Sequence, residues 1–372
     1  MVRVLVAPDK FKGTLDAREV ASAIARGLRG SFPGVEVVER PMGDGGEGTA
    51  SVLVEAFGGG REEFDVDGPL GETVRAPLFR LADGRTIVEM ADASGLRLVP
   101  ESRRDALAAS SRGTGQLISH ALEPGVSVLV ALGGSASTDG GTGAAAAIGW
   151  RFLDARGMSL PSGGGSLERL ARVVPPDRPM RSGSITGLCD VNNELLGPGG
   201  AARSFAGQKG AHDAQVAQLE RGLEVLSERI RTDLGISVDT EPGAGAAGGM
   251  GAGLMAFFNA RLVPGFGFLA DACDLARAIA DVDLVITGEG TLDEGSLGGK
   301  TPIAVARMAR DAGASCLALC GAIHLPDEAL SSAGFEGWSS LEAEIGHDRA
   351  VDDPSGSLAS AAAELMKRHL SG

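Results

Sequence analysis

The chain has 372 residues, 43% of them hydrophobic and 22% charged, and this ordinary globular composition excludes a wholly disordered protein. Its formal net charge of −15 argues against a nucleic-acid partner, whose phosphates would be repelled. No apolar run approaches the roughly 18 residues of a membrane-spanning helix, and Asp9 and Lys10 interrupt the N-terminal segment before a signal-peptide core could form. We therefore expect a cytoplasmic protein that associates with neither nucleic acid nor membranes.

The N-terminal part alternates between strand and helix patterns. Val2–Val6 is predicted as a buried strand, and the helix after it begins at a capping box of Asp16 and Glu19. A second strand, Val35–Val38, and a helix over residues 49–57 follow.

The middle of the chain has a different texture. From about Gly68, a Gly-Glu turn and an Asp-Gly turn predict antiparallel strands. Val126–Leu132 is a further buried strand, and a Gly/Ala-rich helix leads from it to Trp150. Residues 155–183 are expected to be irregular, and a long amphipathic helix then ends at Gly235.

The first pattern resumes near the C-terminus, with strand-like Leu284–Ile286 and Cys316–Leu319 and a closing helix over residues 357–370. The fold class expected is α/β with two α/β domains. A Rossmann- or flavodoxin-like parallel-sheet domain is formed by both termini, and a second α/β domain is inserted into it. The predicted boundaries are 1–70 plus 281–372 for the terminal domain and 71–280 for the inserted domain.

Each of five predicted strands runs into a loop that is rich in glycine and polar residues. These loops are Asp9–Gly13, Gly43–Gly48, Gly133–Gly141, Gly288–Asp293 and Cys320–Gly321. In open parallel sheets, ligands bind beyond the carboxyl ends of the strands. We therefore expect the loops to share one polar cleft.

The first two loops suit anions and a hard cation. Asp9–Thr14 places two lysines just before a helix N-terminus, where unpaired N–H groups attract anions, although a capped helix with solvated lysines has the same sequence. Gly43–Gly48 sets two carboxylates among four glycines, which suits Mg²⁺ held together with substrate phosphates, or a plain turn.

The later loops add a phosphate cradle and further charges. Gly133–Gly143 follows a buried strand, and its N–H groups and hydroxyls could surround phosphates. Cys189–Asn193 places a carboxylate among amides, which suits a general base, a metal ligand or an Asx turn. Lys209 precedes the long helix, and Pro302 at a helix start puts Lys300 at that helix's N-terminus.

Scarce residue types narrow the chemistry. The four cysteines contain no Cys-X-X-Cys pair, which predicts buried free thiols rather than a zinc site. Only five of the 34 basic residues are lysines, and four of these lie in the glycine-containing loops. A lysine ammonium suits phosphate oxygens in tight loops, although so small a sample also has the simple explanation of chance.

Two motif matches are rejected. Gly295–Thr301 is one residue short of a Walker loop, and the GxGxxG of Gly243–Gly248 follows no convincing strand. The five histidines are scattered, and neither a protein-kinase catalytic loop nor a GxSxG elbow is present. Phosphoryl transfer from Mg·ATP fits the remaining lysines, carboxylates and glycine loops best, because it depends on positioning and charge neutralisation.

Seven motifs, taken in chain order, carry a resemblance to a known family. They are APDKFKGTL, GDGGEGT, GGSASTDGGTG, CDVNNELLGPGGAA, FAGQKGA, PGAGAAGGMGAGL and ITGEGTLDEGSLGGKTP. From about residue 3 to 322 the chain resembles the bacterial type 1 glycerate kinases. The resemblance implies ATP- and Mg²⁺-dependent phosphorylation of D-glycerate, usually to 2-phosphoglycerate rather than 3-phosphoglycerate, in a cleft between two α/β domains. Lys10 and Thr14 stand where that family usually has serine.

Chemistry and motif position then give each candidate residue a role. Catalysis is assigned to Lys12, Asp190 and Lys209. Nucleotide binding is assigned to Gly133, Gly134, Ser135, Gly288 and Lys300. Substrate binding is assigned to Asp9, Lys10, Asn192 and Asp139. Mg²⁺ binding is assigned to Asp44, Glu289 and Asp293.

Several points stay open at this stage. The division between metal ligand and base among Asp44, Asp139 and Asp190 is not fixed by the sequence. The alternatives to a kinase are a metal-dependent phosphohydrolase of a small phosphorylated acid and a non-catalytic regulator that binds a sugar acid. The expected partners are ATP and glycerate, and the expected assembly is a monomer or a homodimer.

Replacing Lys12 by arginine tests the argument from the scarce lysines. Lys12→Arg is expected to lose at least about 10²-fold in kcat, because a planar guanidinium cannot take the place of a compact ammonium among phosphate oxygens. Steady-state kinetics at saturating substrates measure this. Turnover near that of the wild type would remove Lys12 from the mechanism.

Overall fold

The computed structural model describes residues 2–177 and 184–371, and the chain forms two compact units. Unit 1 comprises residues 1–44, 51–56 and 266–372, and unit 2 comprises residues 45–50 and 57–265. Both termini therefore belong to the same unit. Of the boundaries expected from the sequence, residue 70 lies within unit 2 and residue 281 within unit 1.

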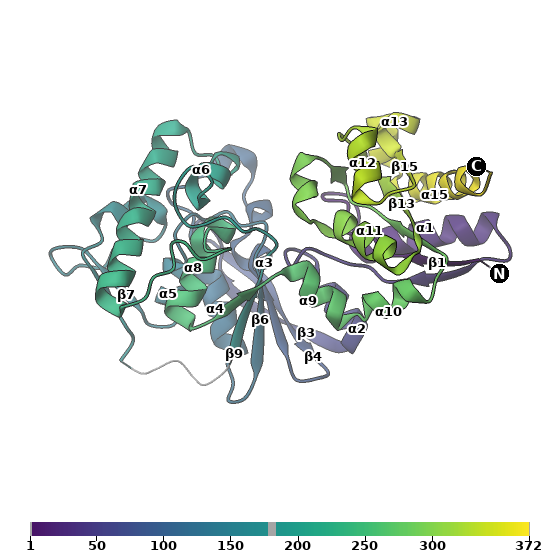
Figure 1. Cartoon of the computed structure of the whole chain (residues 1–372). Coiled ribbons are helices and arrows are strands. Elements are labelled where there is room, and N and C mark those ends of the chain that lie inside the picture. Colours follow the sequence, from purple (N-terminus) through teal and green to yellow (C-terminus); the bar gives the residue numbers. More distant parts are fainter. Residues whose placement is uncertain (1, 178–183, 372) are drawn as a thin grey trace. The chain divides into compact units, whose positions relative to one another are not determined.

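Unit 1 is built on a five-stranded sheet in the order β15-β13-β11-β1-β2, in which every neighbouring pair is parallel (Figure 1). Its strands are β1 (Arg3–Val6), β2 (Glu36–Glu39), β11 (Leu284–Thr287), β13 (Ser315–Cys320) and β15 (Gly337–Ser340). With the strands renumbered in sequence, this is the 2-1-3-4-5 order of a flavodoxin-like doubly wound sheet. The parallel-sheet class predicted from the sequence is confirmed.

Helices connect the parallel strands of this sheet, as parallel strands require a crossover. The main ones are α1 (Ala17–Ser31), α11 (Thr301–Ala312) and α15 (Pro354–Ser371). The shorter ones are α10 (Leu275–Ala280), α12 (Asp327–Ala333), α13 (Leu341–Ile345) and α14 (His347–Asp352), and a two-stranded sheet pairs β12 (Thr291–Leu292) with β14 (Ala322–Ile323). The capping box predicted for α1 is confirmed, because Glu19 N donates to Asp16 Oδ1 and Asp16 N donates to Glu19 Oε2.

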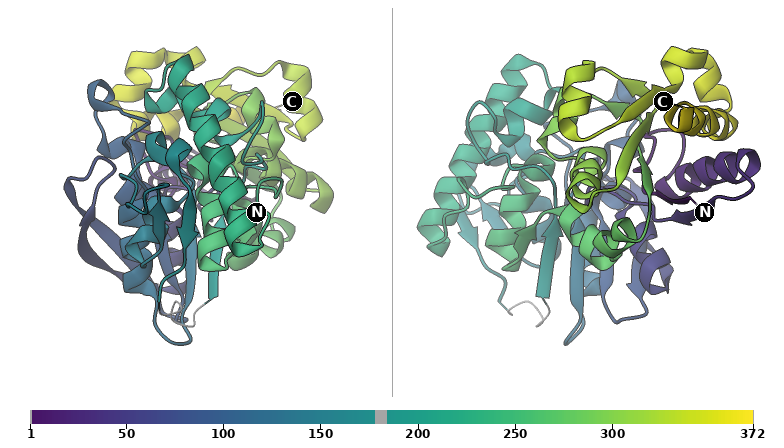
Figure 2. Two further views of the ribbon diagram at one scale, coloured as in Figure 1. Left: turned by 90° about the vertical axis from the view of Figure 1, so that its left-hand side faces the viewer. Right: turned by 45° about the vertical axis from the view of Figure 1, so that its right-hand side comes forward.

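Helices α1 and α15 lie side by side (Figure 2) and are packed closely enough to exclude a side chain between them. A Cβ placed on Gly27 of α1 would lie 1.9 Å from the carbonyl oxygen of Ala359 on α15. Helix packing therefore requires a glycine at position 27, and no ligand is needed to explain it.

Unit 2 contains a six-stranded mixed sheet in the order β10-β9-β6-β5-β4-β3. Its strands are β3 (Gly59–Asp67), β4 (Thr73–Leu81), β5 (Thr86–Glu89), β6 (Ser127–Ala131), β9 (Ser184–Leu188) and β10 (Arg261–Val263). Strands β5, β6, β9 and β10 run parallel, whereas β3, β4 and β5 form an antiparallel meander. The antiparallel strands predicted from the two turns are confirmed.

The remaining elements of unit 2 surround that sheet and share one apolar core. They are α3 (Met90–Ser94), α4 (Arg112–Ala121), α5 (Thr142–Ala147), α6 (Ala201–Phe205), α7 (Asp213–Arg229), α8 (Ala246–Phe258) and the pair β7 (Arg151–Leu153) and β8 (Arg172–Val174). Two further helices, α2 (Thr49–Phe57) and α9 (Gly265–Ala272), contain residues of both units.

Some sequence-based expectations need correction and others hold. Strand β3 was not foreseen, because its sequence GGREEFDVD is charged and mostly exposed, as suits the edge of a sheet. Residues 155–177 contain a 3₁₀ helix and β8, and residues 178–183 of the predicted irregular segment lie outside the described residues. The long helix does end at Gly235, which has a φ of 72° and follows one π-helical turn.

All four cysteines are free thiols, as expected, and Cys189, Cys316 and Cys320 are buried, whereas Cys273 is partly exposed. In the part of the chain that the structure describes, no helix has both the length and the apolar surface needed to span a bilayer.

Two glycines of α1 provide a matched test of the packing against α15. Gly27→Ala is expected to destabilise unit 1 by about 1–3 kcal/mol through overpacking. Gly30→Ala, where an added Cβ meets nothing within 4 Å, should be neutral or stabilising by up to about 1 kcal/mol. Urea unfolding followed by fluorescence reports on this unit through Trp338 in β15 when Trp150, the tryptophan of unit 2, is replaced by phenylalanine in all of the proteins compared. Equal shifts in the two variants would contradict the close packing.

Candidate functional site

The loops that carry the predicted residues of unit 1 lie at one edge of its sheet. Because β1, β2, β11 and β13 are parallel, their carboxyl ends meet there. Strands β2 and β11 lie on either side of β1, so the chain winds in opposite directions from this point, and ligands of doubly wound sheets bind at such a switch point. Asp9 follows β1, and Gly288 and Glu289 follow β11.

Asp9 is 5% exposed and is held from three directions. Its Oδ2 accepts from Thr301 Oγ1 at 2.8 Å, and its Oδ1 accepts from the backbone N–H of Lys10 at 2.7 Å. The ammonium of Lys10 lies 3.5 Å from Asp9 and 3.4 Å from Asp44. Burial raises the pKa of Asp9, Lys10 opposes that rise, and Asp44 adds to it. Three of the predicted residues, Asp9, Lys10 and Asp44, are thus brought together.

A second cluster follows β11. Ser296 Oγ donates to Glu289 Oε1 at 2.7 Å, and Asp293 accepts from the N–H of Ser296, which caps the short 3₁₀ helix Glu294–Gly298. Lys300 is the N-cap residue of α11, as predicted, and its ammonium lies 4.0 Å from Asp293. Burial raises the pKa of Glu289 to about 7, with Asp9 and Asp44 adding to the rise and Ser296 and Lys300 opposing it.

The donor set of unit 1 suits a magnesium ion bound together with a phosphorylated substrate. Among residues 2–177 and 184–371, no group of three or more His, Cys, Asp or Glu side chains is arranged to hold a metal ion. Asp44, Glu289 and Asp293 therefore do not form a closed cage, but Mg²⁺ bound to substrate phosphates needs only one or two carboxylates. The carboxylate of Asp44 adds to the raised pKa of both Asp9 and Glu289 through repulsion, which a divalent cation would relieve.

Two other predicted residues of unit 1, Lys12 and Gly288, lie outside these two charge clusters. Lys12 is exposed in the loop that Phe11 and Leu15 close through an antiparallel bridge. A Cβ on Gly288 would lie 1.7 Å from the carbonyl oxygen of Leu319, so backbone packing alone requires a glycine there. The Gly288 carbonyl accepts from the N–H of Asp9 at 2.8 Å, which ties the loops after β1 and β11 together.

The predicted phosphate loop of unit 2 follows β6 at the carboxyl edge of its sheet. Gly133 and Gly134 are partly exposed, whereas Ser135 is 6% exposed. Gly134 has a φ of +63°, which favours glycine. Strands β5, β9 and β10 end at the same edge, so Glu89 and Asp190 belong to it as well.

Lys209 is the largest fully buried side chain of the unit, at 2% exposed. Its ammonium donates to Ser135 Oγ at 2.9 Å and to the carbonyl oxygen of Ser137. Burial lowers the pKa of Lys209 to about 7, and the carboxylate of Asp139 opposes that fall. A Cβ on Gly248 would lie 2.1 Å from the carbonyl oxygen of Ser137, which Lys209 contacts, so glycine is required where α8 passes this loop. The structure therefore joins Lys209 directly to the loop predicted to bind phosphate.

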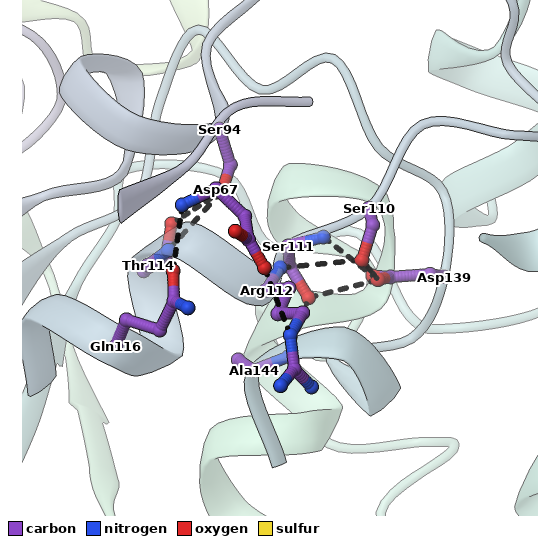
Figure 3. Close-up of polar contacts among 9 residues, drawn as sticks. All are labelled: Asp67, Ser94, Ser110, Ser111, Arg112, Thr114, Gln116, Asp139 and Ala144. Atoms are coloured by element: carbon purple, nitrogen blue, oxygen red, sulfur yellow. Dashed lines mark hydrogen bonds and ion pairs between the residues drawn. The ribbon is translucent and has the colours of Figure 1, made fainter. Parts of the chain in front are cut away.

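Asp139 has the surroundings of a structural carboxylate (Figure 3). It is 0% exposed, and its Oδ2 accepts from the N–H and hydroxyl of Ser111 at 2.8 and 2.9 Å and from the N–H of Gly143 at 3.2 Å. Its Oδ1 accepts from the N–H of Gly141 at 3.1 Å. These bonds join the starts of α4 and α5. A contact between Asp139 and a substrate, as expected from the sequence, would require this network to open.

Asp190 and Asn192 follow β9. Asp190 is half-buried two residues beyond the end of the strand, and Asn192 is exposed. The amide of the neighbouring Asn193 donates to the carbonyl oxygen of Gly199 at 2.7 Å, which stabilises the loop that carries them.

Glu89 and Asp92 were missed by sequence reasoning. Burial, with Asp92 and Glu47 contributing, raises the pKa of Glu89 to about 7, and burial raises the pKa of Asp92 to about 6 despite the partner Arg97. Strand β5 is buried along its whole length, TIVE, and a carboxylate as the last residue of such a strand is the signal that could have found Glu89.

Comparison with known proteins decides the family. The family model described as the glycerate kinase family matches residues 4–370. The glycerate 2-kinase of Escherichia coli is 45% identical over 313 residues, which cover 83% of this chain and 82% of that protein. The glycerate kinase of Halalkalibacterium halodurans is 41% identical over 345 residues, covering 92% and 91%. This chain belongs to the glycerate kinase family.

A solved structure agrees with this assignment. The crystal structure of a presumed glycerate kinase 2 from Salmonella typhimurium LT2 matches with a TM-score of 0.82 and 37% identity, covering 100% of this chain and 99% of that one. The resemblance inferred from the seven motifs is confirmed, and the chain is an enzyme of the kinase class.

Substitution of Lys209 by methionine tests its burial through the pH dependence of stability. Folded protein binds the Lys209 proton only below a pKa of about 7, whereas the unfolded chain retains it up to about 10.5. The cost of the buried charge is therefore complete below about pH 7 and declines as the pH rises toward 10.5. Lys209→Met should raise Tm, and by more at about pH 6 than at about pH 9.

Lys367→Met, at a side chain that is 70% exposed on α15, is the matched control and should show no such trend. A gain in Tm that is the same at both pH values would contradict the low pKa of Lys209. Loss of turnover in a stabilised Lys209→Met variant would separate a functional cost from a folding defect.

Proposed function

We propose that this enzyme transfers the γ-phosphoryl group of ATP to the 2-hydroxyl of D-glycerate, giving 2-phosphoglycerate and ADP. The observation that carries the proposal is the 45% identity to a glycerate 2-kinase over most of both chains. The pairs of lysine and carboxylate in unit 1 and the buried Lys209 at the loop Gly133–Ser135 of unit 2 support it, because phosphoryl transfer depends on fixed charges.

In this proposal unit 1 handles the polyphosphate. Lys12 and Lys300 neutralise phosphate oxygens, and the backbone at Gly288 contacts the nucleotide. Asp44 and Glu289, with Asp293 beside them, would hold Mg²⁺, which supplies charge neutralisation at the phosphates when bound. Asp9 and Lys10 take part in substrate binding through the charge cluster that they form with Asp44.

Unit 2 would supply the groups that act on the acceptor. Asp190 accepts the proton of the 2-hydroxyl as that oxygen bonds to the phosphorus, and the bond from phosphorus to the ADP oxygen breaks. Lys209 binds an anionic group, Asn192 orients the acceptor, and Gly133, Gly134 and Ser135 contact phosphate through N–H groups and a hydroxyl. That both units act on one substrate pair in a shared cleft stays a prediction, as do the cytoplasmic location and the monomeric or homodimeric state.

One experiment separates this function from its rivals. The protein is incubated with ATP and a panel of small hydroxy acids, and the products are identified by ³¹P NMR. We expect a 2-phosphoglycerate signal from D-glycerate that is lost in EDTA and restored by excess Mg²⁺. Phosphate release from a phosphorylated acid without ATP would indicate a phosphohydrolase, and binding of glycerate without turnover would indicate a regulator. A 3-phosphoglycerate signal would overturn the regiochemistry.

A further inference from the structure

A short segment from Glu89 to Leu96 connects two glycine loops of unit 2. It begins at the last residue of β5, continues through α3 and ends in the 3₁₀ turn Leu96–Leu98. The first loop is the part of GDGGEG that lies in unit 2, residues 45–48, which leads into α2. The second is the loop Gly133–Ala136, to which phosphate contacts are assigned above.

On its first side, the segment holds the GDGGEG loop through a side chain. Glu89 is 4% exposed, and its two carboxylate oxygens accept from two backbone groups, the N–H of Ala50 at 2.6 Å and the N–H of Gly48 at 3.1 Å. The first N–H groups of a helix have no partner within the helix, so the carboxylate satisfies donors at the start of α2. Both of its oxygens are used in this contact.

On its second side, the segment holds the phosphate loop through backbone groups. Leu96 N donates to the carbonyl oxygen of Gly134 at 2.7 Å, and Ala136 N donates to that of Ser94 at 2.9 Å. Gly95 and Ser135 form an isolated antiparallel bridge between these two bonds. Seven residues after Glu89, the chain is therefore fixed to the residues that Lys209 contacts.

The two loops also touch each other without intervening side chains. A Cβ on Gly133 would lie 2.8 Å from the Cα of Gly46. Backbone atoms at van der Waals contact leave no space for independent movement. We therefore expect a displacement of residues 45–48 to displace the loop Gly133–Ala136 as well.

Burial and two neighbouring carboxylates oppose the ionisation of Glu89. A carboxylate at this position therefore needs a functional explanation. The carboxylates of Asp92 and Glu47 lie close enough to oppose its ionisation, and Arg97 pairs with both of those neighbours rather than with Glu89. A neutral glutamine would avoid the repulsion, yet its NH₂ group would face one of the two N–H donors. Only a carboxylate offers an acceptor to each.

We propose that Glu89 is a positioning residue for phosphoryl transfer, and that its carboxylate fixes residues 45–50 against the loop Gly133–Ala136. The inference rests on the proposed function of that loop. Glu89 contacts no reacting atom; it acts through the N–H groups of Gly48 and Ala50. Misplacement of catalytic groups by about 1 Å can cost about 10²-fold in rate.

The test is Glu89→Gln, assayed as the full chain with ATP and D-glycerate. We expect kcat to fall by about 10- to 100-fold while KM for glycerate stays within about twofold, the pattern of a lost transition-state interaction. Hydrogen exchange of the Gly48 and Ala50 amides should accelerate in the variant, whereas the rest of unit 2 keeps its protection. A purely structural role would instead lower Tm and raise exchange throughout the unit.

Asp154→Asn is the control for a carboxylate-to-amide change in the same unit. In a surface turn, Asp154 Oδ1 alone accepts from the backbone N–H groups of Arg156 at 2.8 Å and Met158 at 2.9 Å, so an asparagine oxygen can keep both bonds. Its kcat should stay at the wild-type value. If Glu89→Gln does not fold, Glu89→Asp keeps the charge while shortening its reach, and it should show the same local exchange with a smaller loss of kcat.

Three results would overturn the proposal. They are wild-type kcat in folded Glu89→Gln, an equal loss of kcat in Asp154→Asn, and unprotected Gly48 and Ala50 amides in the wild-type protein. A wild type inactive on glycerate would refute the proposed function instead, and the amide exchange data would still show whether Glu89 holds the loop.

Discussion

An ammonium or carboxylate that leaves water loses several kcal/mol of hydration free energy unless protein groups replace the solvent. Lys209, Glu89 and Glu289 each have a pKa near 7, and burial is the largest cause in all three. Glu89 is the last residue of β5, Glu289 follows β11, and Lys209 contacts the loop that follows β6. All three therefore lie at the carboxyl ends of strands. Strongly shifted ionisable groups concentrate at functional sites. The positions of these three buried charges therefore agree with the candidate site at the strand ends.

Glycine is what makes such burial possible. The sequence suggested that the glycine loops leave room for a ligand, but several of the glycines are explained by contacts within the protein. A Cβ at Gly248 would collide with the carbonyl oxygen of Ser137, and one at Gly288 with that of Leu319. Because backbone can then pack against backbone, N–H and C=O groups come within reach of the buried charges and replace the lost water.

The sequence was informative where the signal is local. Neighbouring residues were enough to predict the capping box of Asp16 and Glu19 and the helix over residues 49–57. The scarcity of lysine drew attention to Lys209, which the structure buries. The end of the buried strand β5 could have pointed to Glu89, but its role could not be predicted, because its partners Gly48 and Ala50 lie about 40 positions away and meet it only in the folded chain. Strand β3 escaped because edge strands carry charge where buried strands carry apolar residues.

The sequence did not decide which of Asp44, Asp139 and Asp190 is the general base and which binds metal. The three carboxylates differ in their exposure and in how many hydrogen bonds they accept from the protein. Asp139 accepts from Ser111, Gly141 and Gly143 and is inaccessible, so using it as a base would cost the network that starts α4 and α5. Asp44 lies 3.4 Å from the ammonium of Lys10 and its side chain is 37% exposed, so a cation can reach it. Asp190 is half-buried just beyond a central strand. A general base must reach the acceptor hydroxyl while ionised, and this comparison favours Asp190 for that role.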